Sequence, residues 1–419
     1  MSAKLLSAFE FGTESVKVAL AEMTGDEIIL LGHAELPSEK TIQKGEIVDY
    51  DGFLNLMVDA TTLVEESSGF ELSDSLKLAI SCSNPSLKSF NNTAMVHIED
   101  EQGKVCDDDV KEVVRSARDP KLSEESAVIV TFQKSFTLDS TRKTSKPTGL
   151  IAHTLESEIH IVTMNRNSFD STLSPLMDYF GKEQSITYSS DGIASGFACL
   201  TREEQESPTL VIDLGAGTSG FSFFQDCGCQ ASGLIPVGCH NLINDLAIGL
   251  DLEYGRCKRI LHEEARAISQ QDGRNRMLKV DLLAGNAHRE IPRSSIELIC
   301  ELRLREIFTE IQKKLQVQGV SQLNGAKVYL CGRGALLPEI TDLATEIFQA
   351  PAQIAQVNSS LIKGDTNFMK DPGNTVLAGL LWIAKSEYYN TEFKKNALQL
   401  GFKESMKNAK NFLSNAFRL

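Results

Sequence analysis

Residues 210–224, read as LVIDLGAGTSGFSFF, hold one acid, two glycines and two hydroxyl side chains between two short apolar runs. The apolar runs predict two strands, and the glycine-rich segment between them predicts a tight turn. We expect positive φ angles at Gly215 and Gly217, which would point successive backbone N–H groups into a concavity that attracts an anion. Asp213 ends the first strand, where it can hold a hydrated Mg2+ ion. The segment indicates a phosphate site, and an ordinary glycine-rich hairpin is the alternative.

A second strand-turn-strand pattern opens the chain. Residues 5–11 and 16–21 are apolar, and the turn Gly-Thr-Glu-Ser lies close after the first run. Glu10 precedes its glycine by two residues, as Asp213 precedes Gly215. Two such hairpins far apart in the chain indicate two related halves that face one nucleotide from opposite sides of a cleft, unless the two Gly-Thr turns coincide by chance. In a dinucleotide fold the glycine turn would open a helix, and no helical period follows either turn.

A third glycine turn has a different form. Residues 326–330 predict a strand, residues 331–335 a turn of small residues around Arg333, and residues 337–348 a helix. Backbone at Gly332 and Gly334 could approach a flat adenosine closely.

The composition limits the class of protein. Lys and Arg number 42 against 57 acids, a net charge of −15, which argues against broad nucleic-acid binding. No run of 18 apolar residues occurs, and charged residues begin too early for a signal peptide. The nine cysteines have no regular spacing, which favours reduced thiols. We therefore expect a cytoplasmic protein.

Five segments together resemble the actin superfamily of ATPases and, within it, the FtsA family of bacterial division proteins. They are FEFGTESVK (9–17), VIDLGAGTS (211–219), IPVGCHNLINDLAIGL (235–250), VYLCGRGALLPEI (328–340) and DPGNTVLAGLL (371–381). The third segment is more similar to FtsA than to actin, MreB, heat-shock chaperones or sugar kinases.

The resemblance implies an α/β, actin-like (ribonuclease-H-like), two-lobed ATPase fold with an FtsA-type inserted small α/β domain. In the insert we expect strands at 95–98, 127–132 and 135–138, a helix at 107–116 and an exposed loop at 139–146. The family uses this insert for contacts between subunits and with other division proteins. The implied divisions are a first core domain (1–77, 159–203 and 374–400), the insert (78–158), a second core domain (204–241 and 294–373), a small fourth domain (242–293) and a C-terminal helix (401–419).

The resemblance also implies ATP and Mg2+ as cofactors. Asp191 and Asp213 would be the catalytic pair, Asp191 by orienting the attacking water, although a helix N-cap is the alternative for Asp191. Glu10 and Asp213 would hold Mg2+ through water. The implied nucleotide contacts are Gly12, Thr13, Glu14, Lys17, Gly215, Ala216, Gly217, Thr218, Gly238, Asn241, Lys258, Gly332, Arg333 and Gly334.

Three departures from the family pattern bear on the activity. Gly220 stands where relatives usually carry a second acid. Lys258 and Leu261 stand where the family offers Glu and Lys to the ribose. Arg333 replaces a glycine, where it could crowd the base or stack on it. We therefore expect ATP binding with weak or absent hydrolysis.

The small fourth domain is implied to bind the FtsZ C-terminal peptide. Helices are expected around 254–269 and at 294–315. Ordinary surface charge is the alternative for each of the basic candidate contacts, which are His262, Arg274, Arg276, His288 and Arg293.

The last 19 residues, 401–419, place apolar side chains on one helical stripe and carry four basic residues against one acid. This pattern predicts an amphipathic helix lying on anionic lipid, tethered by polar residues 386–400. A terminal helix packed on its own domain is the alternative. The predicted membrane residues are Phe402, Lys403, Met406, Lys407, Lys410, Phe412, Leu413 and Phe417.

These expectations combine into one hypothesis. An ATP-binding protein forms filaments on the inner face of the cell membrane at the division site, ties FtsZ to lipid and recruits later division proteins. A scaffold of a pilus or secretion machine, similar to PilM, is the main alternative, and a small-molecule kinase is a third class.

Overall fold

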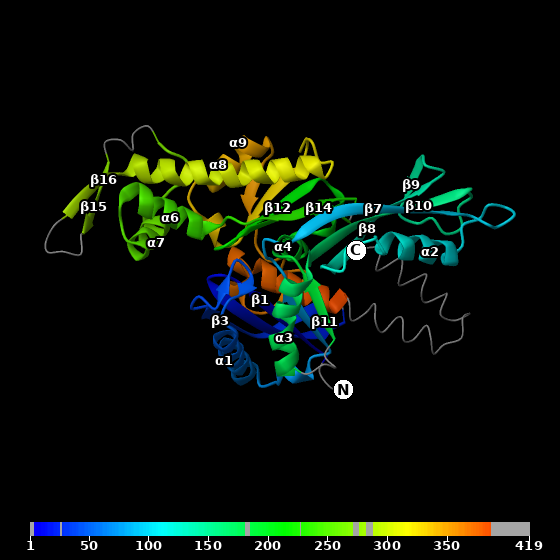
Figure 1. Ribbon diagram of the computed structural model, residues 1–419, viewed down its shortest axis with the longest axis horizontal. Coiled ribbons are helices and arrows are strands. Elements are labelled where there is room, and N and C mark those ends of the chain that lie inside the picture. The colour runs from blue at the N-terminus through cyan, green and yellow to red at the C-terminus, as the bar shows by residue number, and fades with distance from the viewer. Residues whose placement is uncertain are drawn as a thin grey trace.

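The computed structural model describes residues 4–386 except 26, 181–184, 227, 271–275 and 282–287. Within these residues the chain forms two lobes stacked on one another, with a smaller sheet projecting from one end (Figure 1). The predicted helix at 401–419, its membrane-facing residues and almost all of the tether lie outside the described residues.

The first lobe is built on a six-stranded sheet with the order β11-β6-β1-β2-β3-β19. Strands β1, β2 and β3 are antiparallel neighbours, whereas β6 and β11 run parallel to β1. The first hairpin is thus present as predicted. The strands are β1 (Leu5–Phe11), β2 (Ser15–Thr24), β3 (Glu27–Pro37), β6 (Lys77–Ser81), β11 (Ile186–Ser189) and β19 (Ile362–Lys363).

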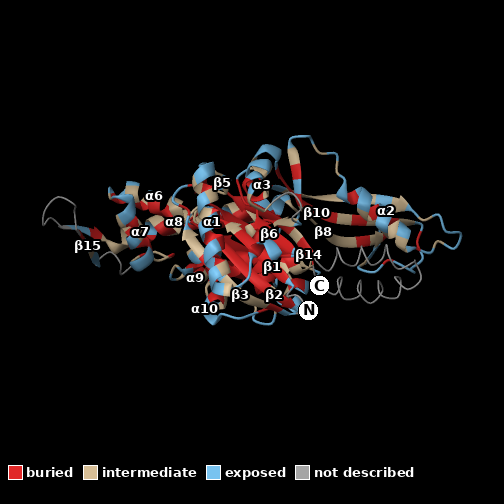
Figure 2. Cartoon of the chain, turned by 90° about the horizontal axis from the view of Figure 1, so that it is seen from below, coloured by how far each residue is buried: buried red, intermediate tan, exposed pale blue. Residues whose placement is uncertain are grey.

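Helices α1 (Tyr50–Ser68) and α3 (Arg166–Phe180) cover this sheet (Figure 1). Helix α1 begins where the Asp49 carboxylate accepts a hydrogen bond from the Gly52 N–H at 3.1 Å, and it ends at Gly69 with φ +75°. Its apolar side chains recur at helical spacing and are buried in a cluster with β1 and β2. Strands β1, β2 and β6 of this sheet are almost entirely buried (Figure 2).

The second lobe is built on a five-stranded sheet with the order β14-β13-β12-β17-β18. Helices α6 (Cys239–Leu250), α7 (Tyr254–Glu263), α8 (Arg293–Val317) and α9 (Ile340–Phe348) share one apolar core with it. The predicted helix around 254–269 corresponds to α7, which is shorter than expected, and the predicted helix at 294–315 corresponds to α8. The strands are β12 (Thr209–Leu214), β13 (Ser219–Gln225), β14 (Gly228–Ile235), β17 (Lys327–Cys331) and β18 (Ala352–Ile354).

Helix α4 (Asp191–Cys199) packs closely on the helical run at 375–386. A Cβ on Gly379 would lie 1.8 Å from the Ala194 carbonyl oxygen, so only glycine permits this approach. A Cβ on Gly192 would likewise lie 2.6 Å from the Phe221 backbone nitrogen in β13. The small residues of α4 therefore bring it against the second sheet.

The projecting sheet has the order β7-β10-β8-β9, and helix α2 (Asp107–Arg118) packs on β7 and β10. Its strands are β7 (Lys88–His97), β8 (Ser126–Leu138), β9 (Arg142–Thr144) and β10 (Thr154–Asn165). The prediction of two strands at 127–132 and 135–138 is wrong: β8 is one strand, and a register shift opposite Glu158/Ile159 accommodates the polar residues between them. The predicted loop at 139–146 contains β9. The insert was predicted to start at residue 78, but β6 belongs to the first sheet and the projecting sheet starts at β7.

A buried polar network joins this inserted sheet to the edge strand β14 of the second lobe. His160 on β10 is fully buried, and its two ring nitrogens lie 2.8 Å from Asn91 Oδ1 and 2.8 Å from Ser232 Oγ. The Gln318 side chain, just after α8, bonds both the N–H and the carbonyl of Ser232 at 3.2 and 2.8 Å. Burial, with Lys134 nearby, lowers the pKa of His160 to about 3, so this imidazole is neutral.

Short elements complete the described chain. Within the described residues, none of the helices combines the length and the apolar composition needed to span a bilayer. The predicted α/β fold with two lobes and an inserted small α/β unit is confirmed. The remaining elements are β4 (Ile42–Gln43), β5 (Glu46–Ile47), η1 (Leu72–Asp74), α5 (Arg202–Glu206), β15 (Met277–Asp281), β16 (His288–Pro292), η3 (Arg333–Leu336), α10 (Thr366–Lys370) and η4 (Pro372–Asn374).

Candidate functional site

A cavity of about 380 Å³ lies between the two lobes and is lined by all three predicted glycine turns. The β1–β2 turn comes from the first lobe, and the β12–β13 turn and residues 332–334 come from the second. Every residue predicted to contact nucleotide or cation lines it except Asn241. Asn241 lies just behind, where its Oδ1 accepts a hydrogen bond from the Gly238 N–H at 3.1 Å and fixes the start of α6.

The two hairpin turns touch across this cavity. A Cβ on Gly217 would lie 2.2 Å from Thr13 Oγ1, and one on Gly215 would lie 2.8 Å from the Thr218 carbonyl oxygen. The predicted positive φ angles at Gly215 and Gly217 are wrong, since neither residue has one. Glycine is needed there because a side chain would not fit. Gly332 does have a positive φ, +73°, and packs on the Leu214 carbonyl.

Three carboxylates line the same cavity, those of Glu10, Asp191 and Asp213. Asp213 is the fifth residue of β12, and Asp191 is the first residue of α4, with Ser190 as the N-cap. Burial, then the neighbouring Glu10, raises the pKa of Asp213 to about 7. Burial, then Asp213 and Glu10, holds the pKa of Asp191 well above its usual value. Each carboxylate therefore makes ionisation of the others less favourable.

Lys17 provides a counter-charge for this cluster. Its Nζ lies 2.9 Å from Glu10 Oε1 and also donates to the Gly373 carbonyl, and the side chain is buried. Burial alone would lower the pKa of Lys17, but Glu10 keeps it above its usual value. Burial raises the pKa of Glu10 even though Lys17 opposes this. Lys17 thus secures the base of the cavity.

The carboxylates fit a hydrated cation better than a directly ligated one. Glu10 Oε2 and Asp191 Oδ1 are buried and accept no hydrogen bond from the described residues, so water molecules around a cation could donate to both. No three His, Cys, Asp or Glu side chains in this part of the chain are grouped to hold a metal directly. Glu10, Asp191 and Asp213 are therefore suited to hold Mg2+ through water.

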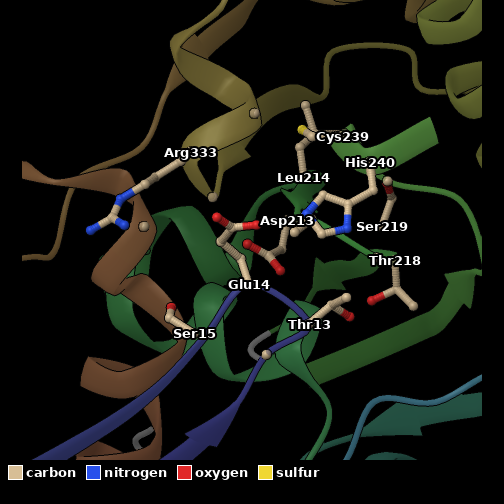
Figure 3. Close-up of a pocket in the computed structure, with 18 of the residues that line it drawn as sticks. Thr13, Glu14, Ser15, Asp213, Leu214, Thr218, Ser219, Cys239, His240 and Arg333 are labelled. Atoms are coloured by element: carbon tan, nitrogen blue, oxygen red, sulfur yellow. Dashed lines mark hydrogen bonds and ion pairs between the residues drawn. The ribbon is translucent and has the colours of Figure 1, made fainter. Parts of the chain in front are cut away.

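Charged groups from opposite lobes meet beside the cavity. Glu14, in the β1–β2 turn, accepts from His240 Nε2 at 2.7 Å and contacts Lys258 Nζ. Arg333 bonds both oxygens of Glu35 on β3 at 2.7 Å. Arg333 and His240 lie on opposite sides of Asp213 in Figure 3. The Arg333 guanidinium therefore points to the first lobe.

Sequence reasoning missed several residues that line the cavity: Glu35, Ser83, Cys239, His240 and Gly373. Glu35 lies within an ordinary strand pattern, and nothing in that pattern indicates that it lines a ligand cavity. Gly373 and the pair Cys239-His240 lie in two of the segments that resemble FtsA, where their positions marked them for attention.

The predicted FtsZ contacts are dispersed. His262 lines the cavity, and Arg293 forms an ion pair with Glu264. Arg276 is exposed and donates to Gln270 Oε1 at 3.2 Å. Arg274 and the His288 side chain lie outside the described residues.

Two family models match the chain. One is the SHS2 domain inserted in FtsA, over residues 85–163, and the other is the cell division protein FtsA, over residues 210–379. The chain belongs to the FtsA family. The first match falls on the inserted sheet and the second on the second lobe with its glycine turns.

Curated relatives extend this match to most of the chain. The cell division protein FtsA of Pseudomonas aeruginosa is 24% identical over 381 residues, which cover 91% of this chain and 89% of that protein. FtsA of Bacillus subtilis is 24% identical over 356 residues, 85% of this chain and 79% of that protein. FtsA of Escherichia coli is 23% identical over 398 residues, 93% and 92% of the two chains.

Solved structures establish the fold class. A PilM–PilN type IV pilus biogenesis complex matches with a TM-score of 0.60 at 14% identity, covering 91% of this chain and 98% of that one. MreB5 of Spiroplasma citri bound to ADP matches with a TM-score of 0.54 at 12% identity, covering 93% and 98%. At these identities the likeness concerns the fold alone, and that fold is actin-like, as predicted.

Proposed function

We propose that the chain binds ATP with Mg2+ in the cavity between its lobes and acts as a division protein that links FtsZ filaments to the inner face of the cell membrane. The observation that carries the proposal is the convergence of three glycine turns from distant parts of the sequence on one cavity. MreB5, which shares the fold, is bound to ADP in one structure and to AMPPNP in another, and this supports a nucleotide as the occupant.

The residues have distinct roles in this proposal. Backbone N–H groups of the two hairpin turns hold the phosphates, and Thr13 and Thr218 add hydroxyl donors. Residues 332–334, which line the same cavity, would approach the adenosine. Mg2+ would neutralise phosphate charge, and Glu10, Asp191 and Asp213 would hold it through water. Asp191 would also orient a water molecule near the terminal phosphate. Gly220 supplies no further acid, so we propose slow or absent hydrolysis.

Membrane attachment is assigned to residues 401–419. Each basic residue near an anionic surface contributes about 1 kcal/mol, so one short helix binds weakly. Head-to-tail assembly would link many such helices, and linked weak sites bind together with far higher avidity. Filament formation and lipid binding therefore support one another. Arg276 and His262 are the exposed basic candidates for the FtsZ peptide among the described residues.

A pilus scaffold similar to PilM is the alternative function. Its support is the shared fold, whereas the match to the SHS2 domain inserted in FtsA favours a division protein. Binding of an FtsZ C-terminal peptide, set against binding of a pilus protein, separates the two.

Two measurements test the proposal. MgATP should raise the melting temperature of the full chain and lose this effect when Asp213→Asn is introduced. Co-sedimentation with vesicles of anionic lipid should fall at least tenfold when residues 401–419 are deleted, and MgATP should increase it only in the full chain. Unchanged vesicle binding after the deletion would refute the anchor, and an unchanged melting temperature would refute the nucleotide site.

A further inference from the structure

Two clusters of charged side chains connect the lobes on either side of the cavity. The first clasp consists of Glu14 from the first lobe and His240 and Lys258 from the second. His240 Nε2 lies 2.7 Å from Glu14 Oε2, and Lys258 contacts the other carboxylate oxygen. Hydrogen bonds from His240 and Lys258, which oppose the effect of burial, lower the pKa of Glu14. This carboxylate is therefore ionised in the clasp.

The second clasp consists of Arg333, from the glycine turn of the second lobe, with Glu35 of β3 and Asp371. The guanidinium forms two parallel bonds of 2.7 Å to the Glu35 carboxylate and a third of 3.0 Å to Asp371 Oδ2. Ser15 Oγ donates to Glu35 at 2.7 Å and fixes its orientation. Bidentate Arg–carboxylate pairing is among the stronger and more directional ionic contacts.

Carboxylates of the chain already pair with the lysine and arginine side chains of the cavity. The Lys and Arg side chains that line it in the described part of the chain are Lys17, Lys258 and Arg333, and each is already paired with a carboxylate. None of these three side chains therefore needs a ligand phosphate as its counter-charge. The contacts that draw the lobes together therefore come from the chain itself.

We propose that the two clasps hold the cleft closed without nucleotide, so that a bound nucleotide changes the separation of the lobes little. A ligand shifts a conformational equilibrium only by its difference in affinity for the two states. If side-chain contacts already keep most molecules in the closed state, a nucleotide can increase the closed population only slightly. The clasps are partly exposed, with the Arg333 side chain 48% and the Lys258 side chain 40% accessible, so salt weakens them. The small effect of nucleotide rests on the proposed function, whereas closure by the clasps does not depend on it.

Energy transfer between dyes at positions 59 and 263 of the full chain tests the inference. Asp59 on α1 and Glu263 on α7 are exposed and belong to opposite lobes. The test variant is Glu14→Gln with Arg333→Gln. The matched control is Glu27→Gln with Arg305→Gln, which removes ion pairs that each lie within one lobe: Glu27 with Lys363 at 2.5 Å, and Arg305 with Glu346 at 2.9 Å.

We expect the unmodified chain and the control to show the same short distance with and without MgADP at low salt. The test variant should show a longer distance without MgADP. Raising KCl from about 50 mM to about 500 mM should lengthen the distance in the unmodified chain and leave the test variant unchanged, which provides a measurement independent of whether the variant folds well.

An unmodified chain that is open without nucleotide and closes on MgADP would overturn the inference, as would equal lengthening in test and control variants. A longer distance in the test variant, with or without MgADP, would support the clasps, because Glu14 and Arg333 also line the nucleotide cavity. An unmodified chain whose melting temperature MgATP leaves unchanged would count against the nucleotide site and not against the clasps.

Discussion

Thr13 and Gly217 meet across the cleft so closely that a Cβ on Gly217 would lie 2.2 Å from Thr13 Oγ1. The two hairpins are therefore fitted to one another, and the phosphate-binding geometry proposed for them depends on this contact.

Gly217→Ala should separate the two turns. We expect a destabilisation of about 1–3 kcal/mol from overpacking and loss of most of the MgATP-induced rise in melting temperature, measured by differential scanning fluorimetry. Gly255→Ala is the control, because a Cβ there meets nothing within 4 Å. Equal nucleotide responses in the two variants would contradict the prediction.

Lys17→Met should leave Glu10 as a buried carboxylate without its counter-charge. We expect a loss of about 3–5 kcal/mol in unfolding free energy by urea denaturation. Adding Glu10→Gln should restore at least half of it. Lys111→Met, which breaks an exposed pair with Asp108, should cost about 0–1 kcal/mol. No recovery in the double variant would argue against the pairing.

Asp213→Asn should change the pH dependence of stability. Because burial raises the pKa of Asp213 to about 7, the native state holds a proton that the unfolded state releases at lower pH. The contribution of Asp213 to the free energy of unfolding therefore falls as pH rises from about 4 to about 7, by at most about 1.4 kcal/mol per pH unit. Without nucleotide and metal, the variant should be more stable than the parent at pH 8 and nearly equal to it at pH 4. A constant difference across this range would refute the assignment.

His160→Gln should change the pH dependence of stability in the opposite sense, because His160 destabilises the fold at low pH. Because burial lowers the pKa of His160 to about 3, the unfolded state takes up a proton below its ordinary pKa while the native state does not. This group's contribution is fully present above about pH 6.5 and declines as pH falls towards 3. We expect the melting temperature of the variant to fall less than that of the parent between pH 7 and pH 5. An identical slope would show that His160 titrates normally.

Local pattern was sufficient for much of the fold. Both hairpins and the strand before Gly332 follow from apolar runs bounded by turn residues, and α2 and α8 follow from apolar residues at helical spacing. The strand β8 did not follow, because Gln133 and Lys134 interrupt its apolar pattern. In the structure Lys134 pairs with Glu158 at 2.7 Å on the neighbouring strand, a contact between residues far apart in sequence.

Site residues that belong to a sequence motif could be predicted, whereas those brought to the cavity only by tertiary packing could not. Gly215 and Gly217 were recognised by residue type, but both are required because a Cβ would not fit. A Cβ on Gly215 would collide with Thr218 in its own turn, whereas one on Gly217 would collide with Thr13 of the other hairpin. Arg333 was recognised as a departure from the family pattern, yet its partner Glu35 lies 298 residues away. No local signal connects those two positions.

The His160 network has a consequence for engineering the family. His160 and Asn91 belong to the inserted sheet, whereas Ser232 and Gln318 belong to the second lobe. A chimera that transplants residues 85–163 from another relative would place foreign groups against Ser232, which contacts this imidazole, and Gln318, which bonds the Ser232 backbone. Such grafts need a donor whose side chains fit positions 232 and 318, so the insert and the strand on which it docks have to be exchanged together.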